Sequence, residues 1–210
     1  MVYDNERLFM PAFPNLAALA GIGFAWIVGC LWSAAGRIGR PGLWVPLGLA
    51  LAAVVFAPPV VGAAAIYPHL LSYYSAAVGG LPGATRLGLE STYWCETYAD
   101  ALPYLNAHAK PGDVVWVEDY SHDVLIYYQM QGRLRSDLRI AAPPGATSVF
   151  DRQGMHGYEA GIADADWVIV EYRQTGFTAG LTGWLAGRTP VYRLSHQGVP
   201  LMDIYRGGAQ

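Results

Sequence analysis

Two long uncharged stretches at the start of the chain restrict its fold more than any other feature. No Asp, Glu, Lys or Arg occurs from Leu8 to Gly36, or again from Pro41 to Thr85. Because about 20 apolar residues span the hydrocarbon core of a bilayer, the sequence predicts two transmembrane helices. We expect them at about residues 15–35 and 43–66, joined by a loop at residues 36–41 and forming a membrane hairpin within residues 1–67.

A cleaved signal peptide is a poor explanation for this opening. Such peptides begin with positive charge and contain a short apolar stretch. Here Asp4 and Glu6 outnumber the single basic Arg7, the apolar run is too long, and a second run follows at once. The hairpin is therefore interpreted as a permanent membrane element.

The charges in the loop predict the orientation of the hairpin. Arg37 and Arg40 lie between the two apolar runs, and positive residues in short loops stay on the cytoplasmic side. The loop is then cytoplasmic, and both Arg7 and the region after the second helix are extracytoplasmic. Pro58 and Pro59 are expected to kink or end the second helix near its outer end.

Residues 68–95 are interpreted as an interfacial connecting segment. Tyr67, Tyr73 and Tyr74 are typical of the aromatic belt at a membrane surface, and residues 68–78 suggest a helix lying on that surface. A helix packed against a soluble domain is the alternative for residues 68–78, and the sequence leaves both open.

Residues 96–210 have the composition of a water-soluble domain. After residue 67 the chain holds 14 acidic and 10 basic residues, a formal net charge of −4. This part is long enough for one domain with its own core, and its mild acidity argues against a nucleic-acid partner. Cys30 and Cys95 lie in different regions, so no disulfide between them is expected.

Helical and strand patterns alternate along residues 96–210. The expected elements are a helix at 96–109, a strand at 114–117, a helix at 121–131 capped by Ser121, a strand at 138–141, a strand at 166–172, a helix at 177–186, and a hairpin of strands 189–195 and 199–206. Alternation of this kind predicts an extracytoplasmic α/β domain with a mainly parallel sheet, covered by helices on both faces.

Candidate chemistry in this domain is sparse. Glu118 and Asp119 end a predicted strand, the position where open α/β sheets often bind ligands, and His122 and Asp123 follow. These groups could form a metal or acid/base site, but an ordinary acidic strand end explains them equally well. His108, His156 and His196 are scattered along the chain. Neither a nucleophile elbow nor a Gly-Lys-Ser/Thr phosphate loop occurs, so the domain alone does not indicate an enzyme.

The opening residues are more informative. Arg7 lies at the predicted outer mouth of the first helix, where its guanidinium could hold a lipid phosphate with two hydrogen bonds. Asp4 and Glu6 could orient Arg7 or bind a polar group. An Arg that only extends to the membrane interface is the alternative interpretation.

Two stretches of the sequence resemble bacterial family 39 membrane glycosyltransferases. The first is RLFMPAFPNLAALAG, Arg7–Gly21, which is similar to the motif at a late membrane helix of that family. The second consists of LSYYS at 71–75 and VGGLPGATRLGLESTYW at 78–94, which resemble the segment after the family's last membrane helix. The family is related to the dolichyl-phosphate-mannose protein mannosyltransferases and to the aminoarabinose transferase that modifies lipid A.

The resemblance implies a function at the outer surface of the bacterial inner (plasma) membrane. Family members are multi-pass proteins that transfer a sugar from a polyprenyl-phosphate donor to an extracytoplasmic acceptor. Their acidic catalytic residue lies on an early external loop that has no counterpart here, so the chain resembles the C-terminal portion of such an enzyme. The expected partners are membrane lipid, the donor, and the remaining transmembrane helices of the full-length enzyme; no cofactor is expected.

The resemblance also suggests roles for individual residues. Arg7 would lie near the donor phosphate together with Asp4, and Tyr3 stands where the family has a His. Glu90, Tyr93 and Trp94 match a family segment, for which a structural role, docking the outer domain onto the membrane part, is the favoured interpretation. No catalytic residue is assigned within this chain.

Two other functions remain as hypotheses. One is a non-catalytic two-helix membrane protein whose outer α/β domain binds a glycan or a partner protein. The other is an anchored nucleotide-binding enzyme, which the lack of a glycine-rich fingerprint after the strand at 114–117 disfavours. Glycines 21, 23 and 29 in the first helix favour a larger helical bundle, because small residues allow neighbouring helices to approach closely.

Overall fold

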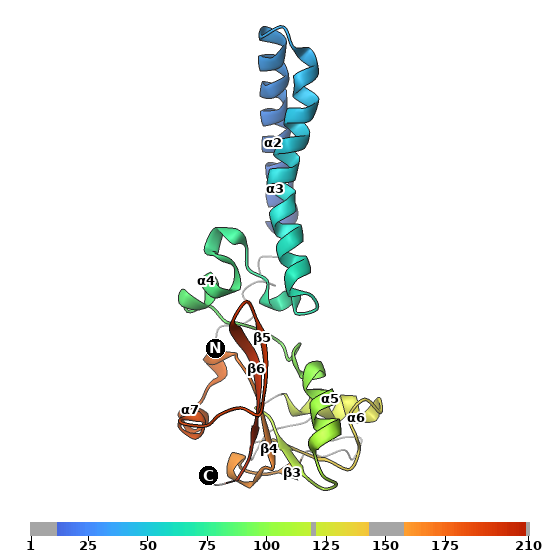
Figure 1. Ribbon diagram of the computed structural model, residues 1–210, viewed down its shortest axis with the longest axis vertical. Coiled ribbons are helices and arrows are strands. Elements are labelled where there is room, and N and C mark those ends of the chain that lie inside the picture. Colours follow the sequence, from blue (N-terminus) through green and yellow to red (C-terminus); the bar gives the residue numbers. More distant parts are fainter. Residues whose placement is uncertain (1–11, 119–120, 143–157, 209–210) are drawn as a thin grey trace. The chain divides into compact units, whose positions relative to one another are not determined.

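The structure, a computed structural model, describes residues 12–118, 121–142 and 158–208. The chain divides into two compact units, residues 1–60 and residues 61–210, and each is described separately. Figure 1 labels the helices and strands of both units.

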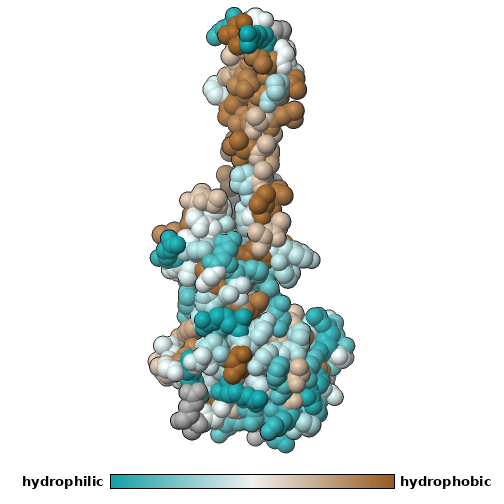
Figure 2. Space-filling model, in the orientation of Figure 1, coloured by the Kyte–Doolittle hydropathy of each residue, from teal (hydrophilic) through white to brown (hydrophobic). Residues whose placement is uncertain are grey.

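The first unit is a pair of long apolar helices. Helix α2 (Ala12–Arg37) is joined by the 3-10 turn η1 (Pro41–Leu43) to α3 (Trp44–Ile66). The aromatic pairs Phe24–Phe56 and Trp32–Trp44 hold the two helices side by side, with ring centroids 6.1 and 6.0 Å apart. Both helices are long and apolar enough to cross a membrane, and Figure 2 shows the apolar side chains on their outer surface.

Helix α3 continues through its two adjacent prolines. Pro58 and Pro59 lie inside the helix, which ends only at Ile66, so the prolines do not terminate it. They lie just before the boundary between the two units, and residues 61–66 of α3 belong to the second unit. Each proline lacks the N–H that a helix interior uses, so this part of α3 has fewer backbone hydrogen bonds.

The second unit is built on a six-stranded sheet. Its strands are β1 (Val114–Trp116), β2 (Arg139–Ala142), β3 (Tyr158–Glu159), β4 (Trp167–Glu171), β5 (Tyr192–His196) and β6 (Val199–Arg206). Their order across the sheet is β3-β2-β1-β4-β6-β5. The first four are parallel to one another, whereas β6 is antiparallel to both β4 and β5.

The sheet is therefore mixed, and the prediction of a mainly parallel sheet is wrong. The error does not concern the elements themselves, since the hairpin of β5 and β6 was expected. Strand β6 pairs along the whole of β4, with Trp167 opposite Arg206 and Glu171 opposite Met202. A two-residue turn at Gln197 and Gly198 joins β5 to β6, so these two strands are also antiparallel.

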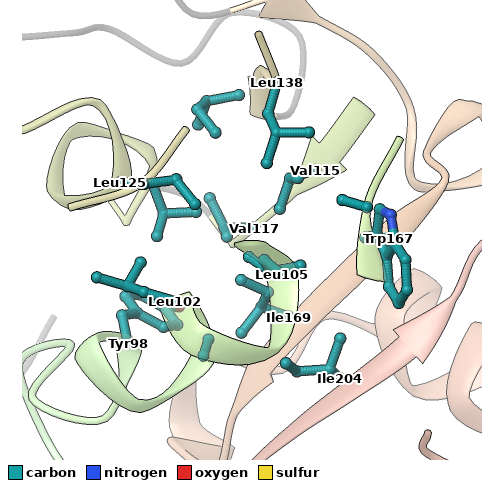
Figure 3. Packing of buried hydrophobic residues seen from close by; sticks show 14 of the residues in the cluster. Tyr98, Leu102, Leu105, Val115, Val117, Leu125, Leu138, Trp167, Ile169 and Ile204 are labelled. Atoms are coloured by element: carbon teal, nitrogen blue, oxygen red, sulfur yellow. The ribbon is translucent and has the colours of Figure 1, made fainter. Parts of the chain in front are cut away.

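Helices cover both faces of the sheet, as expected. Helices α5 (Tyr98–His108) and α6 (His122–Met130) pack on one face against Val115, Ile169 and other inward-facing residues (Figure 3). The opposite face meets α7 (Ala179–Leu185) through Leu181. Neighbouring residues of a strand point to opposite faces of the sheet. Because helices cover both faces, both sets of side chains are apolar and the strand sequences are continuous apolar runs.

The connecting segment is not the surface helix that the sequence suggested at residues 68–78. It forms the 3-10 turns η2 (Leu70–Ser72) and η3 (Ala76–Val78), followed by the short helix α4 (Gly80–Arg86). The N–H of Leu71 and the hydroxyl of Ser72 donate to the Glu96 carboxylate, and these bonds take the place of a continuous helical ladder.

A small apolar cluster fixes the connecting segment to the sheet. Ile66 at the end of α3, Leu81 of α4, and Val199 and Leu201 of β6 are buried together. The end of α3, α4 and the β5–β6 hairpin therefore form one packed layer of the second unit.

Two further 3-10 turns and two helix starts complete this unit. The turns are η5 (Ile162–Asp164) and η6 (Gln174–Gly176). Thr178 caps α7 by accepting a hydrogen bond from the N–H of Leu181. Helix α6 begins next to Ser121 as expected, but the Ser121 side chain makes no capping hydrogen bond, because its hydroxyl lies against the Cys95 thiol.

Candidate functional site

Two glutamates mark the carboxyl edge of the sheet at a change in strand order. Strand β1 lies between β2 and β4 in the sheet. The chain passes from β1 to β2 and β3 on one side, and then crosses to β4 on the other side of β1. Open α/β sheets bind ligands at such a switch point. Glu171 is the last residue of β4, and Glu118 lies two residues after the end of β1. Because β1 and β4 are parallel, both side chains lie at the same edge.

Glu171 is held by the loop that precedes α5. Its side chain is only 3% exposed. One carboxylate oxygen accepts from the Thr97 hydroxyl at 2.9 Å, and the other accepts from the Cys95 N–H at 3.1 Å. Burial raises the pKa of Glu171 above its ordinary value, although these hydrogen bonds partly oppose the shift.

Glu118 is a buried carboxyl whose surroundings raise its pKa into the neutral range. Burial, followed by the nearby carboxylate of Glu171, raises the pKa of Glu118 to about 7, while Arg173 opposes this rise. At neutral pH its carboxyl is therefore about half protonated. It can donate a proton in one form and accept one in the other, as a general acid or base must.

Several buried polar atoms of the second unit lack a hydrogen-bond partner within the described residues, among them Glu118 Oε1, Ser91 Oγ, Tyr98 OH and His122 Nδ1. Unsatisfied buried polar atoms are uncommon in folded proteins and often indicate a site for water or a ligand. We define Glu118, Glu171, Cys95, Tyr98 and His122 as the switch-point cluster.

Cys95 does not supply a nucleophile in this arrangement. Its thiol is free, and its Sγ lies 3.5 Å from Ser121 Oγ. Burial raises the pKa of the Cys95 thiol to about 11, so the reactive thiolate is scarce at neutral pH. Trp94 and Cys95 both have left-handed backbone conformations, with φ of 60° and 59°, which turn the chain so that the Cys95 N–H points at Glu171.

Residues 71–94, which precede α5, form a structural connection within the second unit. The Glu90 carboxylate accepts from the N–H groups of Gln174 and Thr175 at 2.7 and 2.9 Å. The Tyr74 hydroxyl donates to the Glu90 carbonyl at 2.7 Å. The guanidinium of Arg173 lies 4.8 Å from the centre of the Tyr93 ring. Glu90 and Tyr93 thus bind the connecting segment to the loop after β4.

A second cluster of titratable groups lies beside the end of α3. His69 is buried, with its Nε2 2.8 Å from Asp100 Oδ2 and its Nδ1 2.9 Å from His196 Nε2. Burial, followed by the neighbouring His69, lowers the pKa of His196. This row of side chains joins the connecting segment, α5 and the tip of the β5–β6 hairpin.

The structure places only some of the residues that the sequence singled out. Tyr3, Asp4 and Arg7, predicted at the donor phosphate, lie outside the described residues, as do Asp119 and His156. His122 is buried beside Asp123, with 3.4 Å between Nε2 and Oδ1. His108 has a structural role, because its ring stacks on the Tyr104 ring with 4.1 Å between the ring centroids and its Nδ1 hydrogen-bonds to the Tyr104 carbonyl.

Sequence reasoning missed Glu171, His69 and Asp100. Glu171 could have been found, since it ends a predicted strand just as Glu118 does. No local signal relates His69 to His196, which are 127 residues apart. Among the residues that the structure describes, no three His, Cys, Asp or Glu side chains are arranged to hold a metal ion.

Comparisons of the chain with protein-family models, with curated proteins and with solved structures gave no match.

Proposed function

We propose that this chain is the C-terminal portion of an integral-membrane glycosyltransferase, which moves a sugar from a polyprenyl-phosphate donor to an extracytoplasmic acceptor. One observation carries the proposal. Residues 71–94, which follow α3 and resemble the segment after the last membrane helix of family 39 enzymes, make hydrogen bonds through Ser72, Tyr74 and Glu90 that attach the connecting segment to Glu96 and to the loop after β4. Such a connection suits a domain held at the outer end of a membrane helix.

The surface of the helical unit supports a place in a larger bundle. A side-chain carbon at Gly21, Gly23 or Gly29 would meet nothing within 4 Å. These positions leave flat surfaces on α2 where the remaining transmembrane helices of the enzyme could pack closely. In this proposal the protein is a multi-pass protein of the bacterial inner membrane, with residues 36–41 cytoplasmic and the α/β domain extracytoplasmic.

The proposed chemistry divides between this chain and the rest of the enzyme. An acceptor hydroxyl attacks the sugar carbon, the bond to the lipid phosphate breaks, and a carboxylate outside this chain takes the hydroxyl proton. Arg7 stabilises the negative charge on the departing phosphate, while Asp4 orients its guanidinium and Tyr3 lies at the same site.

Replacement of Arg7 tests this assignment. In membranes that contain the native protein, Arg7→Ala should lower sugar transfer from a labelled polyprenyl-phosphate donor by about 100-fold, the usual loss when one charge-stabilising donor is removed. Arg7→Lys should retain part of the activity. Arg135→Ala, which changes an exposed ion pair of the outer domain, serves as the matched control and should transfer normally. Normal transfer by Arg7→Ala would remove Arg7 from the site.

The second candidate is a membrane protein whose outer domain binds a glycan or a partner protein without catalysis. The switch-point cluster favours it, because a half-protonated Glu118 and unsatisfied polar atoms suit a ligand that carries hydroxyl groups. An antibody against residues 96–210 separates the two candidates. The transferase requires a native membrane protein much larger than 22.7 kDa, whereas a native band near 22.7 kDa would favour binding alone.

A further inference from the structure

We propose that one face of the α/β unit lies in the headgroup layer of the membrane and binds lipid directly. The inference rests on the proposed function, since it requires α3 to cross a bilayer. The apolar face consists of exposed side chains of the connecting segment that precede and follow α4 in the sequence: Tyr67, Leu70, Leu71, Val78, Leu87 and Leu89.

The exposed apolar side chains of this unit are unevenly distributed. Tyr67 is 71% exposed and Leu87 is 68% exposed. Beyond residue 89, the large exposed apolar residues of the described chain are Trp94, Tyr127, Met130 and Val191. A concentration of exposed apolar groups on one face indicates an interaction surface, because scattered single residues are the normal pattern.

The charge pattern points to lipid as the partner. The chain carries no Asp, Glu, Lys or Arg from Pro41 to Thr85, so the uncharged sequence continues past the end of α3 through both 3-10 turns and most of α4. Arg86 at the end of α4 is the first charged residue, and its side chain is exposed beside Leu87. An Arg next to exposed leucines suits the boundary where acyl chains meet phosphates.

The packing of the second unit places this face at the right level. Ile66, the last residue of α3, is buried against Leu81 of α4 and Val199 of β6. Figure 1 shows α4 beside the last turns of α3 and the tip of the β5–β6 hairpin, all within this unit. If α3 leaves the bilayer at Ile66, α4 and the turn after it must lie at the same interface. Tyr67 then stands where aromatic side chains are enriched.

Fluorescence quenching in vesicles tests the inference. The full chain is prepared without its native thiols (Cys30→Ser and Cys95→Ser), and a single cysteine labelled with an environment-sensitive dye is introduced by Leu87→Cys. The protein is reconstituted in phosphatidylcholine–phosphatidylglycerol vesicles that contain a lipid with a quencher near its headgroup. Met130→Cys on α6, at a residue that is 49% exposed, is the matched control in the same unit.

The expected result is strong quenching of the dye at position 87 and little quenching at position 130. Adding Arg86→Glu should weaken quenching at position 87, because the anionic lipid would then repel this turn. A dye at position 87 that emits as in water would overturn the inference. A blue-shifted dye without lipid quenching would also overturn it, because the face would then be covered by protein.

A third labelled position separates this inference from the proposed function. Leu49→Cys lies in α3, within the first unit, at a residue exposed on the isolated chain. Quenching at position 49 without quenching at position 87 rejects only the lipid-binding face. Failure at both positions rejects the membrane-spanning helix and the proposed function with it.

Discussion

The imidazole Nδ1 of His69 lies 2.9 Å from Nε2 of His196, while Nε2 of His69 lies 2.8 Å from a carboxylate oxygen of Asp100. When His69 is neutral and donates its Nε2–H to Asp100, its Nδ1 has a lone pair and accepts from the Nε2–H of His196. This contact holds the tip of the β5–β6 hairpin to the connecting segment through the half-buried imidazole of His196.

The first prediction is that acid lowers the stability of the fold through His196. Burial and His69 lower the pKa of His196, whereas Asp100 and Glu96 oppose that change. A histidine with a lowered native pKa binds protons more readily in the unfolded chain, so its contribution to stability falls as pH drops below about 6.5. Unfolding of the detergent-solubilised protein should show a smaller acid loss for His196→Asn than for the wild type.

Ser195→Ala provides the control for this measurement, because it changes an exposed neighbour on β5 and leaves both imidazoles in place. An acid loss that is the same in His196→Asn and in the wild type would contradict the prediction.

The second prediction concerns the charge on Glu118. A carboxyl whose native pKa is raised from 4.5 to about 7 destabilises the fold progressively as pH rises between these values. The difference corresponds to about 3 kcal/mol above pH 7. Glu118→Gln, which keeps the shape and removes the charge, should raise the free energy of unfolding at pH 8 by up to about this amount.

The gain from Glu118→Gln should largely disappear at pH 4, because the wild-type carboxyl is then mostly neutral in both states. Chemical denaturation at the two pH values measures the difference directly. An equal effect of the substitution at both pH values would show that Glu118 is not buried in its charged form.

The third prediction compares two Arg–Asp pairs that differ in burial. Asp203 is fully buried and accepts from Arg193 at 2.7 and 2.6 Å, and from the hydroxyls of Tyr172 and Tyr205. Asp203→Ala leaves three donors without their acceptor and should lower the free energy of unfolding by roughly 3 kcal/mol. Asp137, paired with Arg135 on the surface, supplies the comparison.

Asp137→Ala should have little effect on stability, because solvent screens the exposed pair and can replace its hydrogen bonds. Equal losses from the two substitutions, measured by the same urea titration, would mean that burial does not govern the strength of these pairs.

Much of the α/β fold could be predicted from local sequence patterns. The buried strands β1 and β4 are continuous apolar runs, and the hairpin of β5 and β6 is marked by Gly198 between two strand patterns. The pairing of β6 with β4 could not be predicted, since it depends on which edge of the sheet is open when the hairpin forms. Strand order is a property of the assembled sheet, not of any one segment.

The candidate site was predicted only where it coincides with a strand end. Glu118 was found because a charged residue follows an apolar run. The neighbouring Glu171 accepts hydrogen bonds from Cys95 and Thr97, two residues that precede α5 and show no local sequence pattern. A helix over residues 68–78 does not form, because Leu71 and Ser72 donate their hydrogen bonds to Glu96, a long-range pairing that no local pattern shows.

The fourth prediction concerns Gly83, which lies on α4. A side-chain carbon at this position would collide with the carbonyl group of Val78, because η3 and α4 pack backbone against backbone there. Gly83→Ala must displace one of these segments and so disturb the burial of Leu81 against Ile66, which joins α3 to the sheet. We expect the free energy of unfolding to fall by about 1–3 kcal/mol, as for other overpacked sites.

Gly183 in the middle of α7 is the matched control, because a side-chain carbon there meets nothing within 4 Å. Gly183→Ala should stabilise the protein by about 0.5–1 kcal/mol through the higher helix propensity of alanine. Thermal unfolding of the two variants in the same detergent compares them, and a Gly83→Ala variant as stable as Gly183→Ala would show that α4 does not need this close approach.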